Sequence, residues 1–104
     1  MIITTTENIL GKKYEVLGIV KGCIVHSKNI GADIGASFKT LVGGEIHSYT
    51  DMIEEAREKA EERMKEQALR IGADAIVCVR YVTSSVMQGA SEIFAYGTAV
   101  KFID

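Results

Sequence analysis

The amino-acid sequence predicts an α+β fold with two layers, in the order strand, helix, strand, strand (βαββ). The sheet is expected to be mostly antiparallel and to carry one long helix plus a short helix. Three observations predict this fold: a long helical run in mid-chain, two apolar strands joined by a short turn after it, and one apolar strand before it. Strands joined by a short turn are antiparallel neighbours, and a right-handed crossover through the helix returns the chain to the same sheet. With 104 residues, the chain is expected to form a single domain, residues 1–104.

The first part of the chain is predicted to contain one short and one long strand. Residues 2–5 are expected to form a small edge strand, or an arm that pairs with another chain. Residues 14–25 form the first long strand, and neither of its faces is polar throughout. Gly18 and Gly22 share one face in this pattern, where they permit a bulge or the close approach of another backbone.

A loop and the short helix are expected between the first strand and the long helix. Residues 26–33 are mostly polar or glycine, which is typical of a loop. Asp33 is predicted to cap the short helix, and Gly43 with Gly44 is predicted to end it, because glycine readily adopts the left-handed conformation that terminates helices.

The long helix is predicted to begin near Ser48 or Asp51 and to stop at Gly72. Ser48 with Asp51, or Asp51 with Glu54, has the spacing of a capping box. Its apolar residues recur every three or four positions and form one narrow, alanine-rich stripe: Ile53, Ala56, Ala60, Met64, Ala68 and Ile71. The charged residues between them form i,i+4 pairs, which indicate a solvated face: Glu55–Lys59, Glu61–Lys65 and Glu66–Arg70.

The two strands after the helix, residues 75–84 and 92–103, are apolar on both faces. One helix layer can cover only one face of the resulting sheet, and 47% of the residues are hydrophobic. A large apolar surface left in water marks an interaction surface. We therefore expect a homo-oligomer in which the second sheet face or the sheet edges are buried between copies, with the closed symmetry of a ring or barrel.

Charge and composition exclude several classes of function. The formal net charge is −2 and the isoelectric point is about 5.7, which argues against nucleic-acid binding and against docking onto an anionic membrane. We find no signal-peptide pattern and no apolar run of about 18 residues, so a cytoplasmic protein is expected. The two cysteines are expected to be free thiols in that reducing compartment.

Several short motifs point to a known family. They are Gly18-Ile19-Val20-Lys21-Gly22, Val42-Gly43-Gly44, Gly72-Ala73-Asp74-Ala75 and Gly97-Thr98-Ala99-Val100. With these motifs the chain resembles, over nearly its whole length, the YbjQ-like family, small proteins of unknown function labelled as heavy-metal-binding. The resemblance implies a dodecin-like βαββ subunit and a pentameric ring. It supplies no established reaction.

Metal binding is the first chemistry to weigh, with Cys23, His26 and His47 as the candidate ligands and a divalent metal ion as the cofactor. Cys23 and His26 have a spacing that can chelate a borderline or soft ion on a turn. On a continuing strand these positions point to opposite faces, so the strand would have to end near Val25. Further donors are available in Cys78, Asp33, Glu45 and Asp74. None of the three candidate ligands falls on the family motifs, so the resemblance itself names no metal ligands. Ligands shared between subunits are the expected form of such a site.

No catalytic residues are assigned, because the sequence contains no complete catalytic motif. Asp74 is interpreted as a turn residue whose carboxylate accepts backbone N–H bonds. Arg80 lies in mid-strand and is interpreted either as half of an inter-subunit ion pair or as a contact to an anionic ligand. Asp74 and Arg80 therefore stand as candidate ligand or interface contacts. The leading hypothesis is a non-enzymatic homo-oligomer that binds a metal ion or small ligand at subunit interfaces; the alternative is an enzyme with an inter-subunit Cys/His site.

Overall fold

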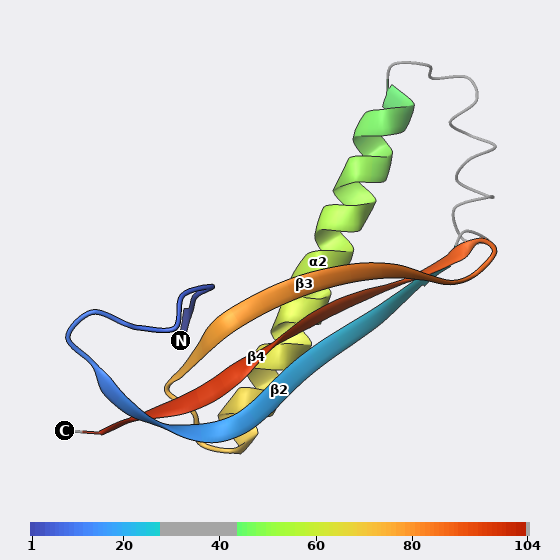
Figure 1. Cartoon of the computed structure of the whole chain (residues 1–104). Helices are drawn as coiled ribbons and strands as arrows, with labels where there is room; N and C mark the ends of the chain where they lie inside the picture. Colours follow the sequence, from blue (N-terminus) through green and yellow to red (C-terminus); the bar gives the residue numbers. More distant parts are fainter. Residues whose placement is uncertain (28–43, 104) are drawn as a thin grey trace.

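The computed structural model describes residues 1–27 and 44–103, and the side chains of residues 1–25 and 50–103. The elements in chain order are β1 (Ile2–Ile3), β2 (Lys13–Ser27), α2 (Gly44–Arg70), β3 (Ala75–Met87) and β4 (Ala90–Ile103). They form one sheet in the order β1-β3-β4-β2, with α2 crossing one face of it (Figure 1). Only the short β1–β3 pair is parallel, since β4 runs antiparallel to both of its neighbours. The α+β, two-layer βαββ fold is confirmed, and β4 is inserted between the parallel strands β2 and β3.

The alanine-rich stripe of α2 packs on β2 and β4, as predicted. Ala60, Met64 and Ala68 are fully buried, in one cluster with Val20 and Ile93 of the sheet. Ile71, expected at the end of this stripe, is instead exposed, because the helix has already ended at Arg70. Small side chains let α2 lie close to the sheet, which removes apolar surface from water on both elements.

Gly22 of β2 is the point of closest approach between the two layers. A Cβ at this position would lie closer than 3.0 Å to the Ala60 carbonyl oxygen and to the Met64 amide nitrogen. Both are helix backbone atoms, so they could not move aside independently of α2. The expectation that this glycine admits another backbone is confirmed.

The two ends of α2 differ in how well the sequence predicted them. The helix begins at Gly44, so the predicted start at Ser48 or Asp51 is wrong: nothing after Gly44 breaks a helix, and Glu45 suits the positive dipole of a first turn. The predicted stop is confirmed. Gly72 has φ +79°, the Gly72 amide donates to the Leu69 carbonyl, and the Ala73 amide donates to the Ala68 carbonyl, which is a Schellman cap.

A bulge in β2 shifts the pattern of faces predicted for the first strand. Val16 pairs with Val100 and Gly18 with Ala99, so Leu17 is an extra residue, and Gly18 adopts φ +143°. Val16 therefore lies on the same face as Ile19, not on the opposite face as strict alternation predicted. The bulge is accommodated at Gly18 because a residue with a side chain rarely adopts that backbone conformation.

β3 also carries a bulge, which falls at Cys78 and Val79. Val77 pairs with Thr98 and Arg80 with Tyr96, and Cys78 has φ +55°. The residue opposite the bulge is Gly97, where a Cβ would lie 2.7 Å from Ile76 Cγ2. The glycine thus gives the bulged strand the room it needs.

The N-terminal segment covers part of the sheet face that α2 leaves free. Ile9 and Tyr14 pack against a second buried cluster of Ala75, Val77 and Val100. The Tyr14 hydroxyl donates to the Glu7 carbonyl, which fixes this segment on the sheet. β1 pairs with β3 of its own chain, so the expected edge strand is confirmed and the arm to another chain is not needed to explain it.

β2 continues through His26 to Ser27, so the predicted loop does not begin at His26. The rest of that loop, with Asp33, and the predicted short helix lie outside the described residues. In the part of the chain that the structure describes, no helix combines the length and the apolar character needed to cross a membrane.

Candidate functional site

Beyond the second buried cluster, the sheet face opposite α2 carries a group of apolar side chains, next to the charged residues Lys21, Arg80 and Glu92, and no other described segment covers it. Cross-strand partners lie on the same face, and Phe94 and Tyr96 alternate with the helix-facing residues Ile93 and Ala95. We call the resulting patch the outer surface, and its residues are Ile19, Cys23, Val25, Val82, Phe94 and Tyr96.

Four of the six side chains of the outer surface are exposed, although apolar side chains are usually buried. Ile19 is 78% exposed, Val25 61% and Val82 44%. The rings of Phe94 and Tyr96 lie 5.6 Å apart, side by side along β4. Exposed apolar side chains grouped on one sheet face are typical of a contact with another molecule.

Cys23 lies half-buried within the outer surface and holds its proton tightly. Burial raises the pKa of its thiol, and the nearby carboxylate of Glu92 raises it further by accepting a hydrogen bond and by its charge. The Arg63 cation acts in the opposite direction and lowers the pKa, but less strongly. Because the thiolate is both the nucleophile and the metal ligand, this environment makes Cys23 a weak candidate for either role within one subunit.

The other predicted metal ligands are not brought to Cys23 by the described backbone. β2 continues past Val25, so the strand end that a Cys23–His26 chelate requires is absent. His47 lies within α2, and the side chains of both histidines are outside the description. Cys78 packs against the second buried cluster. Among the described side chains, no group of three or more His, Cys, Asp or Glu residues could hold a metal ion.

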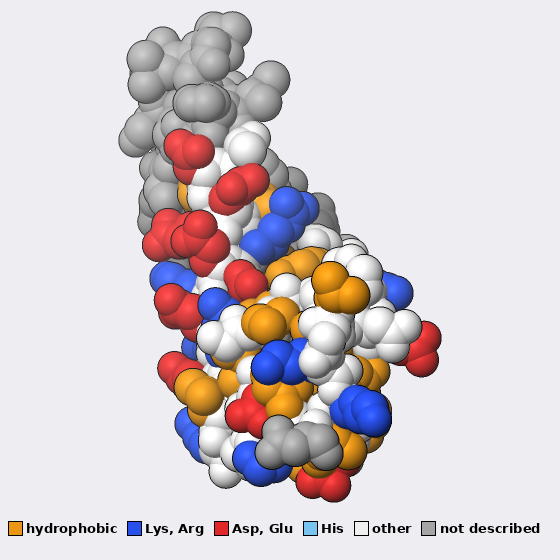
Figure 2. Space-filling model, turned by 90° about the vertical axis from the view of Figure 1, so that its left-hand side faces the viewer, with side chains coloured by type: hydrophobic (Ala, Val, Ile, Leu, Met, Phe, Trp, Pro, Cys, Tyr) orange, Lys and Arg blue, Asp and Glu red, His pale blue; other side chains and the backbone are white. Residues whose placement is uncertain are grey.

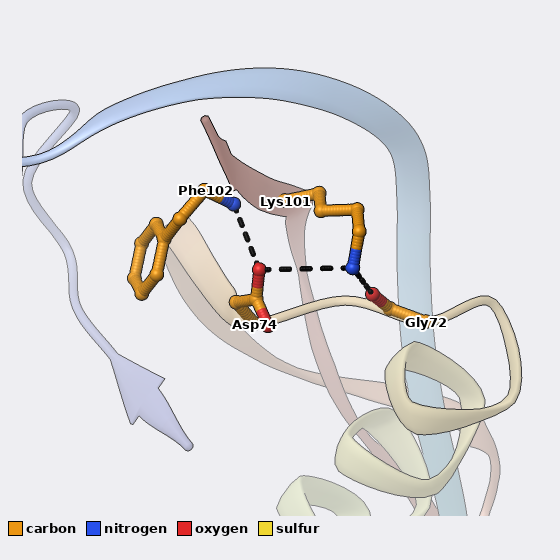
Figure 3. A network of polar contacts seen from close by, with 4 residues as sticks. All are labelled: Gly72, Asp74, Lys101 and Phe102. Carbon is orange, nitrogen blue, oxygen red and sulfur yellow. Dashed lines mark hydrogen bonds and ion pairs between the residues drawn. The ribbon is translucent and has the colours of Figure 1, made fainter. Parts of the chain in front are cut away.

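Asp74 has a structural role at the base of the sheet. Its Oδ2 accepts a hydrogen bond of 2.8 Å from the Phe102 amide, in agreement with the predicted turn function. Lys101 Nζ lies 3.9 Å from the same oxygen and donates to the Gly72 carbonyl at 3.3 Å (Figure 3). The network ties the C-terminal cap of α2 to β4.

Arg80 has no carboxylate partner among the described residues, although its backbone lies in mid-strand. Its Nη1 donates to the Thr5 carbonyl at 3.1 Å and to the Val79 carbonyl at 2.9 Å. The guanidinium therefore fixes the N-terminal segment against β3. Because these bonds leave its charge unpaired, Arg80 stays a candidate contact to another subunit or to an anion.

A groove between α2 and β3 was not predicted from the sequence. Its volume is about 370 Å³, and it is lined by Glu54, Arg57, Glu58, Glu61, Tyr81 and Thr83. Burial raises the pKa of the Tyr81 hydroxyl. The charge of Glu61 and the hydrogen bond between Glu61 and Tyr81 raise this pKa further. The groove exists because α2 packs over β2 and β4 and leaves the far half of β3 uncovered; periodicity alone cannot reveal such an offset.

Figure 2 shows charged side chains of both signs along the helix and apolar ones over the lower part of the molecule.

Comparison with known proteins places these observations in context. A family model described as "Putative heavy-metal-binding" (YbjQ) matches residues 1–103. The chain is 65% identical over 102 residues to a UPF0145 protein of Thermosipho africanus, covering 97% of this chain and 94% of that one. It is 57% identical to a UPF0145 protein of Thermotoga maritima, with 97% and 96% of the two chains covered.

A solved structure shares the fold. It is a protein of unknown function of the DUF74 family from Pediococcus pentosaceus, with a TM-score of 0.69 and 20% identity. The alignment covers 99% of this chain and 98% of that chain. At this identity the likeness concerns the fold alone.

Proposed function

Because the chain belongs to the YbjQ-like family of UPF0145 proteins, we propose that it works as a non-enzymatic homo-oligomer that binds a metal ion or small ligand where subunits meet. The proposed assembly is a closed ring, with five copies as the number implied by the resemblance described above. The observation that carries this proposal is the exposed outer surface, led by Ile19 at 78% exposure. Burying one such side chain contributes about 1.5–3 kcal/mol, so a few per subunit can hold copies together.

The ligand part of the proposal rests on where the candidate donors lie. Cys23 is on the outer surface, so a second copy packed there would bring its own donors towards it. We assign Cys23, with His26 and His47, as ligands contributed by more than one subunit, since the described part of a single subunit holds no sufficient set. A bound divalent ion would have to displace the thiol proton, so its affinity would increase with pH.

The rival function is an enzyme with a Cys/His site between subunits. The raised pKa of Cys23 opposes this alternative, because little thiolate nucleophile is present near neutral pH. No observation in the described residues favours an enzyme over a binding protein. We therefore propose a binding function.

Two matched substitutions test the assembly. Ile19→Lys places a charge on the outer surface, and Leu69→Lys changes an apolar side chain that is 63% exposed on α2, away from that surface. Light scattering after gel filtration should show smaller particles for Ile19→Lys and an unchanged mass for Leu69→Lys. Two variants with the mass of the wild-type protein would contradict the proposed interface.

A second pair of variants tests the ligand. Native mass spectrometry after incubation with Zn²⁺ alone should show retained metal in the wild-type oligomer, loss of that metal in Cys23→Ser, and retention in Cys78→Ser. Equal retention in all three proteins, or none in any, would remove Cys23 from the proposed ligand set.

A further inference from the structure

The sheet has two edges, and side chains of α2 cover part of only one of them. β2 lies at one end of the strand order, and β3 lies next to the other end, where β1 pairs only with Ala75 and Ile76. We call these the β2 edge and the β3 edge. Outward N–H and C=O groups on such edges are templates for pairing with another strand.

The β2 edge is closed at its middle by two side chains of α2. The Lys21 amide donates to Gln67 Oε1 at 2.7 Å. Arg63 Nη1 donates to the Cys23 carbonyl, also at 2.7 Å. Gly22, between these two residues, brings the helix backbone directly onto the strand. An added strand would have to displace both side chains before it could pair here.

The β3 edge is covered in its first part by the N-terminal segment. The Thr4 amide donates to the Ile76 carbonyl, and the Cys78 and Val79 amides donate to the carbonyls of Thr6 and Thr4. The Arg80 guanidinium closes this stretch by donating to the Thr5 carbonyl.

Beyond Arg80 the same edge is open. Every residue from Tyr81 to Met87 is exposed. Among the described residues, two bonds of this stretch lie outside the β3–β4 ladder, and both come from side chains: the Tyr81 hydroxyl bonds to Glu61, and Ser85 Oγ donates to the Met87 carbonyl. The stretch is rich in β-branched and aromatic residues and carries no formal charge. It is therefore a long, uncharged edge of high strand propensity, which proteins rarely leave without a partner.

We propose that the β3 edge from Tyr81 to Met87 pairs, antiparallel and across a two-fold axis, with the same edge of a second copy. The inference rests on the proposed function, in which copies associate, and adds a second contact to it. Open backbone groups require an extended strand as partner. In a second copy, the β2 edge is closed at its middle by Arg63 and Gln67 and is interrupted by the bulge at Leu17. β1 is short and already paired, so among the described elements β3 itself is the best-matched edge.

The side chains agree with this pairing. Two-fold antiparallel pairing always sets one residue opposite its own counterpart, and the stretch overlaps most fully when that residue is Ser84. Thr83 then faces Ser85 of the second copy, and the stretch carries no charge, so no like charges oppose each other. β3 has a second bulge at Val86, because Ser85 pairs with Ser91 and Met87 with Ala90, so the regular register reaches only to Ser85. The two-fold axis requires an even number of copies, so two rings would join back to back.

A cysteine scan tests the inference. In a Cys23→Ser, Cys78→Ser background, single cysteines replace Thr83, Ser84 and Ser85 in turn, and Glu62→Cys on the exposed side of α2 is the matched control. Mild oxidation should give a chain of doubled mass on a non-reducing gel for one position, with Ser84→Cys expected to be best. Directly opposed residues meet the geometry of a disulfide, whereas residues one step away are diagonal neighbours at roughly 7–8 Å.

The outcomes separate this inference from the proposed function. An oligomer by light scattering that forms no disulfide at any of the three positions, or that holds an odd number of copies in native mass spectrometry, overturns the β3 pairing and leaves the proposed function standing. A protein that is monomeric before oxidation overturns the proposed function and this inference with it. Crosslinking of Glu62→Cys to the same extent would also refute the pairing, because it would show random collision.

Discussion

At the scale of single residues, two glycines determine how tightly the layers of this protein pack. Gly22 faces the helix backbone, and Gly97 faces the bulge of β3, where Ile76 and Val79 fill the space that a side chain would occupy. In both places the missing Cβ has been replaced by atoms of a neighbouring element. Substitution there should act through packing and not through a change in strand propensity.

Gly22→Ala should destabilise the protein by roughly 3 kcal/mol, the upper end of what overpacking costs, because the clash is with helix backbone. Gly11→Ala is the matched control: it has φ +75° and no atom within 4 Å of its missing Cβ, so strain alone should cost about 1 kcal/mol. Urea unfolding of the two variants measures the difference. Equal losses of stability would contradict the close contact.

Tyr81 should ionise at higher pH than an ordinary tyrosine, and Glu61 is part of the reason. Glu61→Gln removes the charge and should lower the pKa of Tyr81, whereas Glu58→Gln, in the same groove, should change it less. A raised pKa in the folded state stabilises the protein below the unfolded value of 10.0, and this contribution is lost as pH rises through the folded pKa. Phenolate absorbance against pH measures the shift, and identical curves for wild type and Glu61→Gln would refute it.

At the scale of elements, α2 both covers the sheet and seals one of its edges. The stripe of small residues brings the helix onto β2, and Arg63 and Gln67 then reach the outward backbone groups of Lys21 and Cys23. The sealed edge and the open edge are thus two results of one placement of the helix.

Removing the Arg63 and Gln67 side chains that cover the β2 edge should lower the stability and the solubility of the protein. Arg63→Ala and Gln67→Ala should each lower the free energy of unfolding by about 1 kcal/mol, because each leaves a backbone group of β2 without its partner. The double variant should also aggregate faster, which light scattering during storage measures. Glu62→Ala, an exposed neighbour on the same helix, should change neither property; an equal effect in that control would show that the seal has no special role.

The sequence predicted those elements whose signals are local. The helix stripe from Ala56 to Ala68, the Gly72 stop and the alternation along β4 all follow from short-range spacing, and all are found. The start of α2 was missed because its first turn lacks a distinctive cap and Ser48 offered a better one.

The surroundings of the candidate site depended on contacts between distant segments. Arg63 and Gln67 bond to residues of β2 that are 40 and 46 positions away in the sequence, and the bulges at Leu17 and Cys78 change which residues share a face. Gly18 gave a local signal for the first bulge. A bulge at Cys78 has no such signal, because a cysteine rarely adopts a positive φ.

At the scale of the whole molecule, the protein is a sheet with one face covered and the other face covered only in part. The helix covers one face, the N-terminal segment covers the start of the other, and the outer surface remains, next to the open β3 edge. Val82 belongs both to the outer surface and to the open β3 edge, so one group of neighbouring copies could bury both regions together. We propose that other copies of this chain cover these two regions.

Native mass spectrometry of the wild-type protein, purified without a tag, tests whether copies of the chain assemble. We expect a single closed assembly of many copies that survives dilution, with an even copy number if the β3 edges pair as inferred. A stable, folded species with the mass of one chain would contradict it.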